Sequence, residues 1–198
     1  MLTVTPTAID AVKVIVPKIF GDHRGSFCET YTRDRFIEHG IACDIVQDNQ
    51  SRSAAAGTVR GLHFQTPPMA QDKLIRVLVG SILDVAVDLR RSSPSYGRFV
   101  AEELSADNGK QLLVPVGFAH GFCTLEPDTV VLYKVTNSYS PAHDSGVAWN
   151  DPDLDIAWPI AADDARNPPA RNRQGDPVRQ GYAAAVVQIP ARLVRVAP

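Results

Sequence analysis

The sequence predicts an all-β protein, either a β-sandwich or a barrel, and two observations support this prediction. The apolar runs are short and rich in β-branched residues, which suits strands better than helices. Turn signals separate these runs at GDHRG (21–25), SPSYG (93–97), ADNG (106–109), EPD (126–128) and WNDP (149–152). The alternation of strands and helices that is typical of a parallel sheet is not indicated.

Several runs have the length and spacing of strands. They are LIRVLVGSILDVAVDLR (74–90), RFVAEEL (98–104), QLLVPVG (111–117), GFCTL (121–125) and TVVLYKVTN (129–137). One helix is predicted over TRDRFIEHG (32–40), which Thr32 or Asp34 caps and Gly40 ends. Another short turn is expected near residues 161–166.

The composition changes near residue 168, where we expect the main domain to end. A chain of 198 residues suits one domain with its own core, which we assign to residues 1–168. The loop-like stretch PPARNRQGDPVRQG begins at this boundary. Residues 169–198 are expected to form a C-terminal extension, a loop followed by an added edge strand or a loosely held tail.

The charge balance argues against a nucleic-acid-binding protein. Lys and Arg number 20 and Asp and Glu 22, for a formal charge of -2, whereas such proteins usually carry a basic excess. Three scattered cysteines, Cys28, Cys43 and Cys123, fit packing residues in a reducing compartment. The first twenty residues show no signal peptide or membrane span, so we expect a cytoplasmic protein without a membrane partner.

Strand alternation sorts the polar side chains into faces. In RGLHFQ (60–65), His63 and Gln65 share one face, while Leu62 and Phe64 share the other. In ILDVAVDLR (82–90), Asp84, Ala86 and Asp88 alternate with Val85, Val87 and Leu89. A polar side chain on an inward face is costly unless it meets a partner or lines a ligand cavity. His63, Lys73 and Tyr133 are candidates for such a cavity.

These three residue types can together invert a carbon next to a ketone. Histidine takes up and releases a proton near neutral pH, a lysine ammonium stabilises an enolate oxygen, and a tyrosine returns a proton from the opposite face. Arg24, Arg60 and Arg76 are candidates for binding phosphate. Taken one at a time, each of these residues is more often structural or simply solvated.

The chain resembles the dTDP-4-dehydrorhamnose 3,5-epimerase family over roughly residues 10–160. The resemblance rests on FGDHRGSFCETYTRDRF, RGLHFQ followed by QDKL, LLVPVGFAHGF, YKVTNSY and WNDPDLDIAWP, which occur in this order. It implies a cupin-like jelly roll with a few short helices, and a homodimer in which a strand passes to the partner sheet. It also implies a dTDP-4-keto-6-deoxy sugar as substrate, and no cofactor, because nothing is oxidised overall.

The resemblance also implies roles for individual residues. His63 is the base, Lys73 polarises the ketone, Tyr133 is the acid on the far face, and Tyr139 stacks on the thymine ring. Arg60 is expected to hold the diphosphate. The other substrate-binding positions that the resemblance implies are Arg24, Phe27, Glu29, Gln47, Asn49 and His120.

Two positions depart from the family pattern. The family places the acidic partner of the histidine in a motif S-x-K-D-x-x-x-P, and AADDARNPP is the counterpart here, which makes Asp164 the expected partner of His63. Asp84, or another acid that faces inward, is the alternative partner. Asp144 stands where the family commonly has glutamate, and is expected to contact the substrate with a shorter arm.

Three other functions compete with this interpretation. A metal-dependent cupin is disfavoured, because GLHFQ supplies only His63 and His120 is isolated from further ligands. A binding module without catalysis would use the same pocket, but would not need the base and the acid, which are both present. An epimerase that inverts only carbon 3 or only carbon 5 would share most of these motifs.

Overall fold

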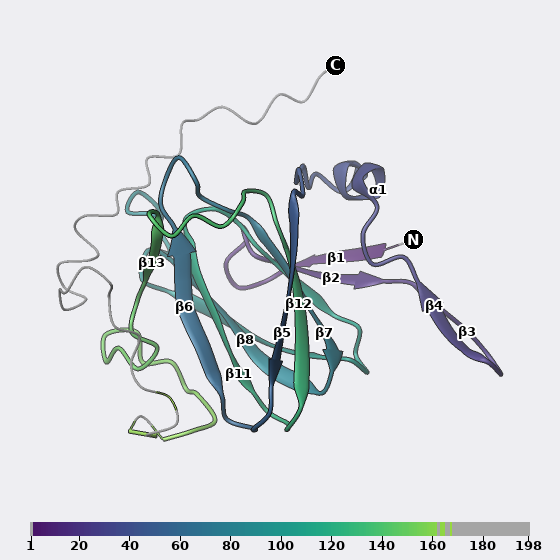
Figure 1. Ribbon diagram of the computed structural model, residues 1–198. Helices are drawn as coiled ribbons and strands as arrows, with labels where there is room; N and C mark the ends of the chain where they lie inside the picture. The colour runs from purple at the N-terminus through teal and green to yellow at the C-terminus, as the bar shows by residue number, and fades with distance from the viewer. Residues whose placement is uncertain (1, 162, 165–166, 168–198) are drawn as a thin grey trace, which may run out of the picture.

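Residues 2–161, 163–164 and 167 are described by a computed structural model, in which two antiparallel sheets face each other (Figure 1). The six-stranded sheet has the order β1 (Leu2–Pro6), β2 (Lys13–Pro17), β10 (Gln111–Val114), β7 (Lys73–Val79), β12 (Thr129–Val135) and β5 (Gln47–Ser53). The five-stranded sheet has the order β13 (Asp144–Gly146), β6 (Val59–Gln65), β11 (Phe118–Thr124), β8 (Ser81–Asp88) and β9 (Phe99–Ser105). The predicted β-sandwich is confirmed.

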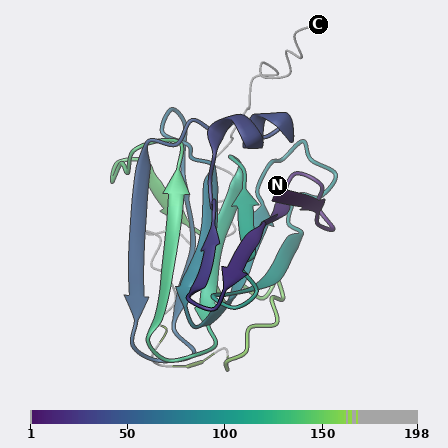
Figure 2. The same cartoon turned by 90° about the vertical axis from the view of Figure 1, so that its right-hand side faces the viewer.

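A separate hairpin and one short helix complete the described elements. Strands β3 (Ile19–Asp22) and β4 (Gly25–Cys28) pair with each other and project from the side of the sandwich (Figure 1). The predicted helix is confirmed as α1 (Arg33–Glu38), which lies near the upper ends of the strands in Figure 2. Thr32 occupies the N-cap position without a side-chain hydrogen bond, and Gly40 follows the helix at φ 75°.

The sandwich has an inner core and two outer clusters. Alternation along β7 and β8 turns Ile75, Val77 and Ile82 toward the inner core between the sheets. Val85 and Val87 point the other way and pack under Trp149 and Trp158, which cover the outside of the five-stranded sheet. A third cluster places Phe36 of α1 against the outside of the six-stranded sheet, next to Ile15, Leu74 and Leu113.

An extra residue in β6 changes the face on which its side chains lie. In the pairing with β11, the register moves from His120 opposite His63 to Phe122 opposite Arg60, so that three steps on β6 match two on β11. This β-bulge brings Gly61 against β11, where an added Cβ would lie 2.5 Å from the Cα of Gly121. Only glycine fits such an approach, and its φ of 141° is also one that L side chains rarely adopt.

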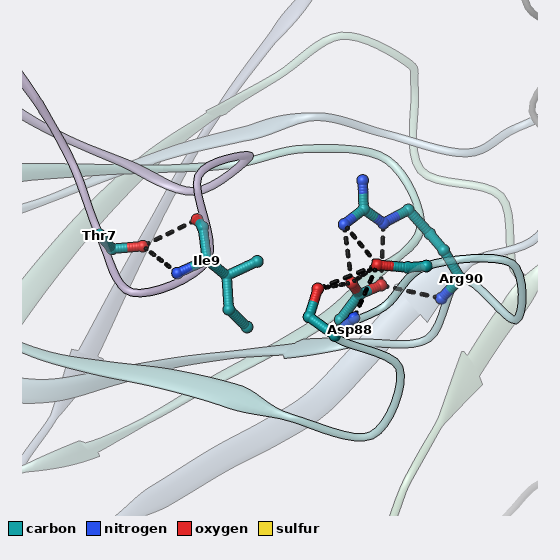
Figure 3. A network of polar contacts seen from close by, with 6 residues as sticks. Thr7, Ile9, Asp88 and Arg90 are labelled. Atoms are coloured by element: carbon teal, nitrogen blue, oxygen red, sulfur yellow. Dashed lines mark hydrogen bonds and ion pairs between the residues drawn. The ribbon is translucent and has the colours of Figure 1, made fainter.

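A polar network fixes the loop after β8, as Figure 3 shows. The buried Asp88 carboxylate accepts hydrogen bonds from Arg90 Nε (2.8 Å) and Nη2 (2.7 Å) and from the hydroxyls of Ser93 and Ser95 (both 2.6 Å). The Arg90 guanidinium also lies 4.6 Å from the ring centre of Phe118. Figure 3 also shows Thr7, whose hydroxyl donates to the Ile9 carbonyl at 2.9 Å in the loop between β1 and β2.

Three sequence predictions concern the C-terminal part of the chain and membrane spans. The turn near residues 161–166 is present in part, since Asp164 N donates to Ala161 O at 3.1 Å. Residues 169–198, predicted as a C-terminal extension, lie outside the described residues. In the part of the chain that the structure describes, no helix has both the length and the apolar character needed to span a membrane.

Candidate active site

A cavity of about 330 Å³ opens between the two sheets. Its walls come from strands β5, β6, β7, β11, β12 and β13 and from the segments beside them. The residues that line it are Gln47, Asn49, Ser51, Arg60, His63, Phe64, Gln65, Gln71, Lys73, His120, Phe122, Tyr133, Tyr139 and Asp144. The cavity thus collects nine of the residues singled out from the sequence.

His63 lies on β6 between two neighbouring strands. Its register partners are His120 on β11 and Gly146 on β13. An added Cβ at Gly146 would lie 3.6 Å from His63 Nδ1, so this nitrogen is next to β13. The His63 side chain also lines the cavity.

Lys73 reaches His63 from the opposite sheet. Its ammonium donates a hydrogen bond to the His63 carbonyl oxygen at 3.2 Å. Burial lowers the pKa of Lys73 to about 8, although the carboxylates of Asp144 and Asp84 act in the other direction. A group with this pKa is still mostly protonated at neutral pH, so the cavity holds a cation beside the imidazole.

Tyr133 extends from β12 into the same cavity. Burial raises the pKa of its phenol, and the positive charge of Arg60 only partly opposes this rise. The phenol therefore keeps its proton at neutral pH and can act as an acid. Tyr133 points inward with Val131 and Val135, since both valines are buried while Lys134 pairs with Asp48 on the other face.

Arg60 spans from β6 toward β5 along the cavity wall. Its Nε donates to Ser53 Oγ at 3.1 Å, and Nη2 donates to the Arg52 carbonyl at 3.2 Å. These two bonds hold the guanidinium in place while the side chain lines the cavity. Arg76, also considered from the sequence for phosphate, does not line this cavity, because it alternates with Ile75 and Val77, which face the inner core.

His120 pairs with a buried acid behind the cavity wall. Its Nε2 lies 2.7 Å from Asp84 Oδ1, and both side chains are almost fully buried. The second Asp84 oxygen, Oδ2, is buried and has no hydrogen-bond partner among the described residues. The acid considered as an alternative partner of His63 therefore bonds His120 instead.

A chain of polar contacts lines the mouth of the cavity. Gln47 Nε2 donates to Asn49 Oδ1 at 2.7 Å, and the Tyr139 amide donates to Gln47 Oε1 at 3.1 Å. The Tyr139 hydroxyl donates to Asp144 Oδ2 at 3.2 Å. Tyr139 is 52% exposed, and its ring offers a flat surface on which a base could stack.

Three predicted binding residues do not reach the cavity of this single chain. Arg24 and Phe27 lie on the projecting β3–β4 hairpin (Figure 1), where Arg24 Nη2 contacts Asp22 Oδ2 at 2.6 Å. Phe27 is 66% exposed. Glu29 follows the hairpin and forms an ion pair with Arg35.

Asp164, the predicted partner of His63, is half-buried and does not line the cavity. Its backbone takes part in turn hydrogen bonds with Ala161 and Asn167. Its role stays a prediction.

Five cavity residues were not predicted as site residues. Of these, Gln65 shares the face of His63 in the sequence pattern, and this alternation was the available signal. Gln65 is 5% exposed, and its amide bonds Met69 O at 2.6 Å and Ser140 N at 2.7 Å, so it holds the surrounding loops. Within the described residues, no three His, Cys, Asp or Glu side chains gather as a metal-binding group would require.

Comparison with known proteins identifies the family. A family model described as dTDP-4-dehydrorhamnose 3,5-epimerase matches residues 6–172. A relative of that name from Sinorhizobium fredii is 54% identical over 152 residues, which are 77% of this chain and 78% of the relative. Another, from Escherichia coli, is 47% identical over 160 residues, 80% of this chain and 85% of the relative.

A solved structure agrees with the family model. The dTDP-4-dehydrorhamnose 3,5-epimerase of Bacillus anthracis, with TDP and PPi bound, is 53% identical with a TM-score of 0.80, over 81% of this chain and 92% of that chain. The chain described here has the same cupin-like β-sandwich. It therefore belongs to the dTDP-4-dehydrorhamnose 3,5-epimerase family.

Proposed function

We propose that this cavity inverts carbons 3 and 5 of dTDP-4-keto-6-deoxy-D-glucose to give dTDP-4-keto-L-rhamnose. The observation that carries the proposal is that His63, Lys73 and Tyr133 line one cavity, with the Lys73 ammonium 3.2 Å from the His63 carbonyl. Inversion at both carbons, rather than one, is favoured because the relatives compared above are 3,5-epimerases by name.

The chemistry follows from the acidity of the carbons next to the ketone. His63 Nε2 takes the proton from carbon 3 or carbon 5, and the electron pair of the broken C–H bond forms an enolate whose oxygen is at carbon 4. The Lys73 ammonium stabilises that oxygen. The Tyr133 hydroxyl then gives its proton to carbon 5 from the opposite face, while water serves carbon 3. Only protons move, so the step needs no electron acceptor.

The remaining cavity residues bind the nucleotide part of the substrate. Arg60 carries the forked donors that match diphosphate oxygens, and Tyr139 stacks on the thymine ring. Asp164 is the acid that fixes the tautomer of His63 and stabilises its protonated form. Gln47, Asn49, His120 and Asp144 contribute further contacts from the cavity wall.

Exchange in deuterated water tests the reaction. Incubation with dTDP-4-keto-6-deoxyglucose should place deuterium at carbons 3 and 5, read by NMR. His63→Ala should reduce exchange at both carbons by a factor of about 10² or more. His39→Ala is the matched control, since His39 caps α1 outside the cavity. Label at one carbon indicates a single-carbon epimerase, and no label indicates a binding module.

The exposed hairpin supports a homodimer in which each protomer completes the other's site. Ile19, Phe20 and Phe27 on the hairpin are all about half exposed or more, which is unusual for apolar side chains that have no covering partner. A second copy would cover them. In that dimer the hairpin, with Arg24 and Phe27, and the adjacent Glu29 would enter the cavity of the partner subunit.

Complementation between two inactive variants tests the shared site. His63→Ala removes the base, and Arg24→Ala removes the hairpin cation. Random assembly makes about half of the dimers mixed, and in each mixed dimer one of the two sites has both an intact base and an intact hairpin. Co-expression should therefore restore about one quarter of the wild-type activity. Failure of the mixture to regain activity means that each hairpin serves its own cavity. If Arg24→Ala alone keeps full activity, the hairpin is not part of the active site.

We also place the enzyme in the cytoplasm. Cys28, Cys43 and Cys123, all within the described residues, form no disulfide, as is usual in a reducing compartment.

A further inference from the structure

The side chain of Asn167 forms two hydrogen bonds with the backbone at the edge of β6. Its Oδ1 accepts from Val59 N at 2.7 Å, and its Nδ2 donates to Gly57 O at 2.7 Å. The amide thus supplies a donor and an acceptor where a neighbouring strand would, beyond the end of the short β13. The Asn167 carbonyl accepts from Trp149 Nε1 at 3.2 Å, and the residue is only 5% exposed.

Asp164 is tied to this fastened residue through the backbone. Asn167 N donates to Asp164 O at 2.9 Å, and Asp164 N donates to Ala161 O at 3.1 Å. These two hydrogen bonds tie the Asp164 backbone to Ala161 on one side and to Asn167, which is bonded to β6, on the other. The predicted acid is therefore held close to the strand that carries His63.

His63 presents one ring nitrogen toward the same edge. β13 lies on the side of β6 turned away from β11. Asn167 lies on the same side, because it bonds Val59 N, whereas the preceding residue, Thr58, bonds Thr124 of β11. His63 Nδ1 is beside Gly146 of β13, where an added Cβ would lie 3.6 Å from this nitrogen and 2.8 Å from the Leu62 carbonyl oxygen. A carboxylate arriving from that edge would meet Nδ1 and leave Nε2 to the substrate.

We propose that Asn167 is a positioning residue that holds Asp164 beside His63 Nδ1. This inference rests on the proposed function, in which His63 is the base and Asp164 its acidic partner. Asn167 touches neither substrate nor reacting atoms. Its effect on catalysis passes through the carboxylate, which fixes the imidazole with its proton on Nδ1 and stabilises the imidazolium formed when Nε2 takes up a proton.

The pH–rate profile distinguishes this role from simple structural support. A carboxylate beside His63 raises the pKa of the imidazole, and the base acts only when unprotonated. Loss of the carboxylate from that position should therefore move the acidic limb of kcat/KM to lower pH. Asn167→Ala and Asp164→Asn should both show this movement, with about a tenfold loss of kcat in each.

The double variant and a packing control complete the test. Asn167→Ala combined with Asp164→Asn should be no slower than Asp164→Asn alone, because Asn167 acts only through Asp164. Trp149→Phe removes the bond to the Asn167 carbonyl but keeps the side-chain bonds to β6, so thermal stability should fall while the acidic limb stays in place.

The two proposals fail in different ways. If Asp164→Asn leaves the limb and the rate unchanged, Asp164 is not the partner of His63 and the proposed function must be revised on this point. If Asp164→Asn moves the limb but Asn167→Ala does not, the partner is right and the positioning role of Asn167 is wrong. If the loss of kcat in the double variant equals the product of the losses in the two single variants, Asn167 likewise gives only structural support.

Discussion

Arg60 and His63 face the same cavity although they are three residues apart on β6. Regular alternation would turn them to opposite faces of the sheet. The extra residue between them on β6, relative to β11, restores the common face. One short segment therefore carries both the phosphate-binding arginine and the base that we propose.

Gly61→Ala tests this arrangement. The new Cβ would lie 2.5 Å from Gly121 Cα and 2.9 Å from His120 O, so one strand must move. We expect a loss of about 4 kcal/mol or more in unfolding free energy, together with loss of activity. Gly40→Ala is the control, because φ is also positive there but nothing lies within 4 Å, and about 1–2 kcal/mol should be lost. Equal losses in urea unfolding would argue against the close approach.

The sandwich and part of the cavity could be predicted from the sequence because the apolar runs have strand length and are rich in β-branched residues. In β12, the two-residue period of a strand places Tyr133 on the same face as Val131 and Val135. The bulge could not be predicted, because it depends on the approach of two glycines, Gly61 and Gly121, from distant parts of the chain.

Strand β5 was missed for a different reason. Its sequence, QDNQSRS, is polar throughout, so no apolar alternation marks it. The structure explains this composition: Gln47, Asn49 and Ser51 line the cavity, while the residues between them are exposed. A strand with a polar cavity on one side and solvent on the other has the composition of a loop. The resemblance to a family identified Gln47 and Asn49 where periodicity could not.

Tyr133→Phe separates proton removal from proton return. His63 can still take a proton from the sugar, so deuterium should continue to enter carbon 5. Without the phenol, return from the opposite face should slow, and net inversion at carbon 5 should fall by a factor of about 10² or more. NMR of the sugar in deuterated water follows both quantities in one sample. Unchanged inversion would assign the acid to another group.

Lys73 should set the alkaline limit of activity. Burial lowers its pKa to about 8, and only the ammonium form stabilises the enolate. We expect kcat/KM, which reports the free enzyme, to fall as the pH rises through about 8. In Lys73→Arg, which keeps its charge to a much higher pH, this limb should move upward even if the maximum rate is lower. A limb that stays in place would belong to a different residue.

The charge of Asp84 should move the alkaline limb of the pH–rate profile to higher pH, opposite to the effect of burial on Lys73. Its carboxylate raises the pKa of Lys73, against the stronger effect of burial. Asp84→Asn still offers His120 an acceptor oxygen but removes the charge, so the alkaline limb should shift to lower pH. Glu102→Gln, directly opposite on β9, makes the same change in charge at a residue that is not among the carboxylates that raise the pKa of Lys73. If Asp84→Asn and Glu102→Gln give the same pH–rate profile, the buried Asp84–His120 pair has no specific effect on the pKa of Lys73.

Asp88 should contribute to stability in a way that disappears in acid. Burial alone would raise its pKa, but the hydrogen bonds from Arg90, Ser93 and Ser95 outweigh burial and lower the pKa to about 2. A carboxylate whose pKa is lower in the folded state stabilises the fold at pH values above its unfolded pKa of 3.8, and this contribution is lost as the pH falls toward about 2.

Asp88→Asn should therefore reduce the unfolding free energy by about 3 kcal/mol at neutral pH. The difference from the wild type, measured by urea unfolding, should shrink as the pH falls from about 4 to about 2. Asp22→Asn, at an exposed ion pair with Arg24, should leave the unfolding free energy nearly unchanged. A difference for Asp88→Asn that stayed constant across this range would show that the loop is held by packing, such as that of Arg90 on Phe118, rather than by the carboxylate charge.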